Sequence, residues 1–200
     1  MPTPNYAKTA SHLEVVGRFS VKHKDFFNMK ELYNLLHEWL VQNEYASRAD
    51  RDFGEVLMLE RIRQESGKEV WCYWRNSKNP AGSSFYRFVL ELNYHIILLK
   101  STEVIHEGVK YSTNWGEVEL NFVSKLVIDP EGKWQKNWFT KSVFPLFFRR
   151  IYKKNWEMHR KELYREAYRW QQAAKEYLKL RVFAPEPEER FWPELGLGQK

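Results

Sequence analysis

The chain of 200 residues has little of several features on which common protein functions depend. Its one cysteine, Cys72, excludes an intrachain disulfide and any zinc site built from several cysteines. No stretch approaches the roughly 18 consecutive apolar residues of a membrane span, so no transmembrane segment is expected. The first residues, MPTPNYAKTASH, lack the apolar region of a signal peptide, and we therefore expect a reducing, cytoplasmic location.

The sequence also lacks the short motifs of common catalytic and phosphate-binding sites. It contains neither GxxxxGK[ST] nor GxGxxG, and it has no serine nucleophile elbow. Its six histidines show no HExxH motif and no paired spacing for metal ligation. Cys72 lies between Trp71 and Tyr73, an apolar setting that favours a buried, unreactive thiol. We therefore expect no cofactor, no metal and no enzymatic activity.

Aromatic side chains are what the sequence has in excess. Nine Trp, eleven Tyr and thirteen Phe supply large buried areas, enough for a sizeable core without disulfides. Charged residues make up 29% of the chain, a fraction typical of a globular protein. We expect a single α+β domain over residues 1–183, followed by a tail rich in proline and acid over residues 184–200.

The N-terminal third predicts one strand and one helix. Apolar and polar residues alternate from Leu13 to Lys22, the pattern of a strand with one dry face. Asn28 is followed three residues later by Glu31, as at the start of a capped helix. Apolar residues then recur at helical spacing, which predicts a helix over residues 29–42.

The middle of the chain predicts a series of antiparallel strands. The predicted strands cover residues 55–63, 69–75, 85–99, 102–106, 109–111 and 118–128. The first two flank a turn at Gly67, and Tyr94, Ile96 and Leu98 are among the apolar residues that share one face of the third. Residues 102–106 and 109–111 are short strands around one turn, so we count about five strands in this region. With the N-terminal strand, we expect a curved antiparallel sheet of about six strands.

After residue 140 the apolar period changes from two to that of a helix. One stripe comprises Phe144, Phe147, Phe148, Ile151 and Tyr152. A second stripe, at steps of seven, comprises Trp156, Leu163, Trp170 and Tyr177, with Ala167 and Ala174 beside it. The two stripes differ in phase, so we expect long C-terminal helices that bend near residues 153–155 and pack with their rings against one face of the sheet.

This order of elements resembles the helix-grip arrangement of lipid-transfer and polyketide-cyclase-like proteins. That resemblance rests on element order and involves no sequence motif. It implies a pocket for a small molecule or lipid between sheet and helices, lined by residues such as Trp71, Tyr86, Phe88 and Tyr94. The segments MKELYNLLHEWL, STNWGEVELNF, RIYKK and KEYLKL also resemble a group of hypothetical archaeal proteins without known function.

Two groups of polar residues are candidate sites. Glu91, Asn93 and His95 project from one face of the same predicted strand, and Glu117 and Glu119 join them if the registers agree. A carboxylate beside an imidazole suits general acid–base chemistry, and the alternative is a solvated sheet face. The second group is the basic face of the C-terminal helices: Arg149, Arg150, Lys153, Lys154, Arg160 and Lys161.

The basic face reflects an uneven distribution of charge. Between Lys133 and Arg181 the chain has 14 Lys or Arg and 4 Asp or Glu, whereas the remainder is net acidic. Such a face binds nucleic acid, an acidic protein or an anionic membrane surface, or is simply solvated. In the tail, Phe191, Trp192 and Leu195 form a short apolar segment that docks on its own domain, docks on a neighbouring copy, or stays disordered.

The sequence favours a non-enzymatic binding or assembly module. It would contact a partner protein or another copy of itself through its C-terminal helices and tail. Two alternatives stay open: a helix-grip binder of a small molecule or lipid, and an RNA- or DNA-binding protein.

Overall fold

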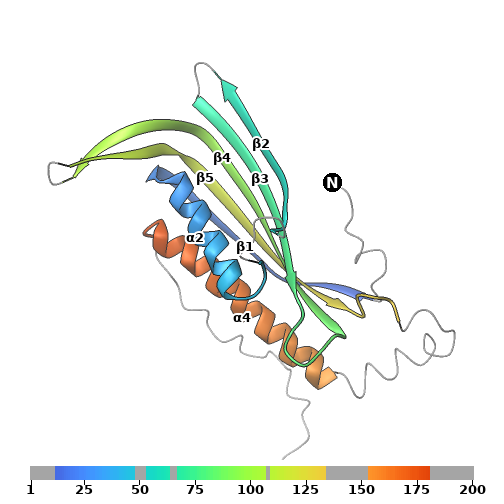
Figure 1. The fold of residues 1–200 in the computed structure, drawn as a ribbon. Helices are drawn as coiled ribbons and strands as arrows, with labels where there is room; N and C mark the ends of the chain where they lie inside the picture. The colour runs from blue at the N-terminus through green and yellow to red at the C-terminus, as the bar shows by residue number, and fades with distance from the viewer. Residues whose placement is uncertain (1–11, 48–52, 64–66, 107–108, 134–152, 181–200) are drawn as a thin grey trace, which may run out of the picture.

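The structure, a computed structural model, describes residues 12–47, 53–63, 67–106, 109–133 and 153–180. The elements in chain order are β1 (His12–Phe27), α2 (Met29–Gln42), β2 (Glu55–Arg63), β3 (Gly67–Lys78), β4 (Tyr86–His106), β5 (Val109–Ile128) and α4 (Lys153–Tyr177). The strands form one antiparallel sheet in the order β1-β5-β4-β3-β2. Both helices lie on the same face of this sheet (Figure 1), so the expected α+β class is confirmed.

The sheet formed by the described residues has five strands, so the expected six strands are not confirmed. The segments 102–106 and 109–111, predicted as separate short strands, are the far ends of β4 and β5. The pairing of these two strands extends as far as His106 and Val109, with one register shift between Ile97 and Lys100. Among the described residues α4 is the one C-terminal helix, and the stripe predicted over residues 144–152 lies outside them.

The start of α2 confirms the predicted helix cap. The side chain of Asn28 accepts hydrogen bonds from the backbone N–H groups of Lys30, at 3.1 Å, and Glu31, at 3.3 Å. These N–H groups have no partner within the helix, so the cap satisfies donors that would otherwise need water. The hydroxyl of Tyr177, at the end of α4, donates to the backbone oxygen of Asn28 at 3.0 Å. The two helices are therefore antiparallel and joined at this end.

The apolar stripe of α4 points inward, as the spacing predicted. Leu163, Ala167, Trp170 and Ala174 are all buried. The indole of Trp170 stacks on Trp39 of α2, with ring centroids 5.9 Å apart, and meets Phe122 of β5 edge-on at 4.9 Å. Its Nε1 donates to the backbone oxygen of Leu36 at 3.3 Å. One side chain thus contacts both helices and the sheet.

A bulge in β4 changes which residues face the helices. The pairing of β4 with β5 shifts between Ile97 and Lys100, and Leu98 has a φ of 59°, in the left-handed region that β-strand residues avoid. Up to Ile96 the even-numbered residues face the helices, but beyond the bulge the odd-numbered residues do. The period-two prediction for Leu98 is therefore wrong, and Leu99 takes the inward position.

Replacing Asn28 by Ala is expected to lower the free energy of unfolding by about 1 kcal/mol, because two N–H groups at the start of α2 lose their acceptor. Urea unfolding followed by tryptophan fluorescence measures this change. Asn28→Asp is the matched control, since it keeps an oxygen in the cap position, and it should retain most of the stability. Equal stability of the Ala variant and the parent protein would contradict this account of the cap.

Candidate functional site

A hollow of about 510 Å³ lies between the first turn of α2 and strands β2 to β5. We call it the α2 cavity. Its lining combines apolar, hydrogen-bonding and charged side chains: Met29, Lys30, Tyr33, Glu55, Met58, Lys68, Leu99, Ser101 and Asn114. These residues come from α2 and from four strands, so the cavity exists only in the folded chain.

Two bulges supply the sheet side of the α2 cavity. The β4 bulge turns Leu99 and Ser101 toward the helices, and Ser101 pairs across the sheet with Asn114 of β5. A second bulge lies between Glu55 and Leu57 of β2, so Glu55 and Met58 face the cavity although they are an odd number of residues apart. Regular alternation would have directed both Leu99 and Ser101 away from the helices and would have placed Glu55 and Met58 on opposite faces.

Glu55 is held in place by groups on both sides of it. The hydroxyl of Tyr33 donates to its carboxylate at 2.7 Å, and the thiol of Cys72 lies 3.6 Å from the same oxygen. The preceding residue, Gly54, packs so closely on β3 that an added Cβ would lie 1.9 Å from the backbone oxygen of Arg75. A glycine is therefore required there, and it brings the start of β2 against β3.

The rest of the α2 cavity lining includes two lysines and one amide side chain. Lys68 pairs with Glu60 at 2.7 Å on the exposed rim, and Lys30 is exposed in the first turn of α2. The side-chain oxygen of Asn114 accepts from the backbone N–H of Met29 at 3.2 Å, which ties β5 to the helix start. Such a lining of apolar groups with a few placed polar ones is typical of small-molecule sites.

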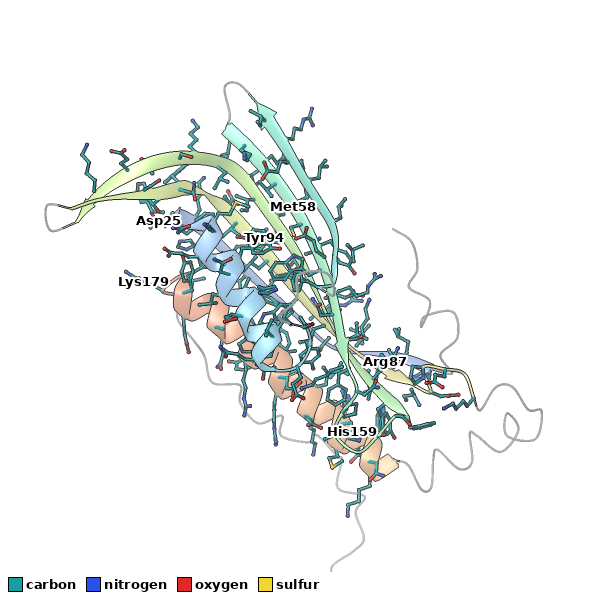
Figure 2. The ribbon with its side chains drawn as sticks, in the orientation of Figure 1. Asp25, Met58, Arg87, Tyr94, His159 and Lys179 are labelled. Atoms are coloured by element: carbon teal, nitrogen blue, oxygen red, sulfur yellow. The ribbon has the colours of Figure 1, made fainter. Side chains whose placement is uncertain are left out.

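Beneath α2, Cys72 and Tyr94 are neighbours across β3 and β4. Cys72 is a free, buried cysteine, as expected from its apolar sequence context. Burial, with the nearby Glu55 carboxylate, raises the pKa of its thiol to about 12, so the thiol stays protonated and is no nucleophile near neutral pH. Burial also raises the pKa of Tyr94, whose hydroxyl makes no hydrogen bond within the described part of the chain. Figure 2 shows Tyr94 between the sheet and the helices.

The predicted polar group Glu91, Asn93 and His95 lies on the face of the sheet that points away from the helices. Glu91 is buried and accepts from Arg75 at 3.0 Å and Lys125 at 2.6 Å. His95 lies apart from this cluster: its Nε2 is 3.2 Å from Glu69, and its ring stacks on Trp71. Asn93, between them, is exposed.

The strand register brings Glu119, but not Glu117, opposite His95, since Glu117 pairs with Ile97. The carboxylate of Glu91 is thus neutralised by two cations, and the trio forms two separate contacts instead of one acid–base site. A polar site at these three residues stays a prediction.

The side chains predicted to line a pocket lie elsewhere. Trp71 is on the outer face beside His95. Tyr86 and Phe88 are in the core near His159 of α4, with ring centroids 4.7 Å and 5.9 Å from it. Sequence reasoning missed the polar residues of the α2 cavity, and only the bulges, which leave no clear signal in the sequence, bring them together.

Part of the predicted basic face is described. Lys153, Lys154 and Lys161 are exposed on α4, whereas Arg160 is paired with Glu14 of β1 at 3.2 Å and lies over the ring of Trp156. The remaining members of this prediction, Arg149 and Arg150, are outside the described residues, as are Phe191, Trp192 and Leu195 of the tail. Binding by either group stays a prediction.

Within the described ranges, no cluster of three or more His, Cys, Asp or Glu side chains is arranged to hold a metal ion. None of the described helices has the length and apolar character needed to cross a membrane.

Comparisons with known proteins give little further information. No protein-family profile matches the chain, and no curated protein matches it. The expected likeness to hypothetical archaeal proteins therefore finds no support. Among solved structures, the chain is similar to the di-domain ARO/CYC StfQ from the steffimycin biosynthetic pathway, with a TM-score of 0.24 and 15% identity. The match covers 82% of this chain and 49% of that protein, so this chain spans about half its length.

This comparison corrects one expectation. The expectation of no enzymatic activity is contradicted to this extent: the similar protein is an aromatase/cyclase, which is an enzyme. That prediction depended on missing sequence motifs, and a site assembled from several strands needs no such motif. The TM-score and identity are too low to transfer an activity or a substrate to this chain.

Folding stability is expected to fall as the pH rises above about 9. Burial raises the pKa of Cys72 to about 12 and also raises the pKa of Tyr94 and Tyr45, so the folded chain keeps protons that the unfolded chain releases. The contribution of these three groups to folding stability is therefore fully present below the ordinary thiol and phenol pKa values. It decreases as the pH rises above them.

Urea midpoints measured from pH 8 to pH 11 test this prediction, and Cys72→Ala should flatten the decline over the lower part of that range. A stability that rises with pH in this window would contradict the burial of these groups.

Proposed function

We propose that the protein binds a small molecule with an apolar body and a polar end in the α2 cavity. The observation that carries the proposal is the cavity itself, a hollow of about 510 Å³ with apolar walls and convergent hydrogen-bonding groups. Binding sites for small molecules commonly have volumes of roughly 300–1,000 Å³ and this mixture of lining groups.

The apolar part of the ligand would lie against Met29, Met58 and Leu99. Methionine side chains are flexible and polarizable, so they adapt to ligands of different shape. Burying the apolar part of the ligand here favours binding, because each Å² of apolar surface removed from water contributes about 25 cal/mol of favourable free energy.

The polar end of the ligand would meet two kinds of group. The Glu55 carboxylate, held by Tyr33, accepts hydrogen bonds, whereas Ser101 and Lys30 donate them. A ligand that offers both a donor and an acceptor at one end satisfies this pattern, and a pure hydrocarbon leaves it unpaired. The cavity thus favours an amphipathic molecule over a fully apolar one.

The basic face of α4 supports nucleic-acid binding less well. Among its described cations, Arg160 is paired with Glu14 at 3.2 Å, whereas Lys153, Lys154 and Lys161 are exposed. Charges that are already paired release fewer counterions from a phosphate backbone, and this release supplies most of the affinity for nucleic acid.

Binding of the amphipathic dye 1-anilinonaphthalene-8-sulfonate tests the proposal. Its fluorescence should rise saturably with the parent protein. Ser101→Trp fills the α2 cavity from its rim and should weaken dye binding at least about tenfold, since it removes the volume the dye needs. Ser112→Trp is the matched control: Ser112 lies on β5, is exposed and is outside the cavity lining, so dye binding should change less than about twofold.

Equal dye binding by the parent protein and Ser101→Trp, with both folded by circular dichroism, would overturn the proposal. A complementary measurement is native mass spectrometry of freshly purified protein, in which a co-purified small molecule should be lost from Ser101→Trp and kept by Ser112→Trp.

A further inference from the structure

The outer edge of β2 has no partner strand among the described residues. This strand ends the sheet, and no described strand pairs with its second side (Figure 1). The backbone N–H and C=O groups of alternate residues therefore point outward, ready to pair with another strand. The edge is also apolar: Leu57, Met58 and Leu59, in the middle of the strand, have 43%, 46% and 52% of their surface exposed.

Strands at sheet edges usually carry features that prevent such pairing, and β2 has few of them. Proline, lysine, strong bulges and short length are the common ones. β2 has nine residues, with neither proline nor lysine; its bulge lies at its start, between Glu55 and Leu57, and residues 56–59 carry no charge. The other edge strand, β1, has charges along its exposed end at Lys22, Lys24 and Asp25. β2 is therefore the edge that lacks protection.

We propose that two copies of this chain associate through β2, with the two strands antiparallel about a two-fold axis at Met58. The pairing would join two five-stranded sheets into one continuous sheet of ten strands. The proposal rests on the side-chain pattern of β2 and is independent of the ligand proposed for the α2 cavity.

The charges in the second half of β2 favour this register over registers whose axis lies nearer Arg63. About a two-fold axis, paired residues lie on the same face of the sheet, so the axis passes through a single residue. An axis at Met58 sets Leu57 of each copy opposite Leu59 of the other, so the interface contains two such leucine pairs. An axis at Leu59 would set Leu57 opposite Arg61, and an axis at Glu60 would set two like carboxylates against each other.

Aromatic residues of β3, the strand next to β2, extend these leucine pairs across the sheet. Within one chain, Leu57 lies opposite Tyr73 and Leu59 lies opposite Trp71, all on the face that points away from the helices. With the axis at Met58, each copy contributes one half of a cross-strand row that runs from Trp71 through Leu59 to Leu57 and Tyr73 of the second copy. Such rows of aromatic and aliphatic pairs stabilise antiparallel sheets.

The geometry also connects assembly with the cavity. Met58 and Glu55 of β2 are part of the α2 cavity wall, and Figure 2 shows Met58 out on β2, toward the edge of the sheet. A second copy would hold β2 on both sides and so restrict the motion of that wall.

Sedimentation through a concentration series measures the association. The parent protein should change from monomer to dimer in the micromolar range, and Leu59→Lys should weaken the dimer at least about tenfold by placing a charge opposite Leu57. Val15→Lys is the matched control, because Val15 is an exposed apolar residue on the other edge strand, and it should leave the dimer unchanged.

A parent protein that stays monomeric up to about 100 µM would overturn the proposal, as would a Leu59→Lys variant that dimerises as strongly as the parent. Because Leu59 is half exposed, the substitution should not prevent folding, and circular dichroism verifies this.

Cysteine cross-linking tests the register. Met58 lies opposite Cys72 within the chain, so the test uses a Cys72→Ala background to prevent an internal disulfide. In that background Met58→Cys should form a disulfide-linked dimer, since residues at the axis have Cα atoms about 4.5–5.5 Å apart. Glu60→Cys, on the same face but two residues from the axis, should link far less. The reverse result would overturn the proposal.

Discussion

The burial of Trp170 is the interaction on which the rest of the structure depends. Its indole is in contact with Trp39 of α2 and Phe122 of β5, and its N–H donates to the backbone of Leu36. A side chain of this size, fully removed from water, stabilises the contact of α4 with both α2 and the sheet. Because α2 is held at its middle in this way and at its start by Tyr177, its first turn stays above the bulged strands, and the α2 cavity lies between them.

The two faces of the sheet have different chemistry. The face toward the helices is apolar apart from a few polar groups, and burial keeps Cys72 and Tyr94 neutral there. The opposite face carries paired charges, such as Glu91 with Arg75 and Lys125. A buried carboxylate needs such partners, because an uncompensated charge would cost several kcal/mol. Because charged groups lie on one face of the sheet and apolar groups on the other, an apolar ligand fits only the face toward the helices.

β2 contributes to both proposals through different surfaces. Its inner face provides Glu55 and Met58 to the α2 cavity, whereas its outer face and free backbone edge are the surface proposed for a second copy. An edge strand that pairs with one neighbouring strand is less restrained than a central strand that pairs with two. Association at this edge would therefore restrain the wall of the sheet that is least restrained in a single chain.

Local patterns in the sequence determined the α+β class, the limits of α2, its Asn28 cap and the inward stripe of α4, because each depends on residues within a few turns of one another. Only the tertiary structure decided the number of strands, the inward turn of Leu99 and the meeting of Glu55, Ser101 and Asn114 in one cavity. The reason is that a bulge reverses strand alternation through a single backbone conformation, here a positive φ at Leu98, which is stabilised by the packing around it and not by the residue itself.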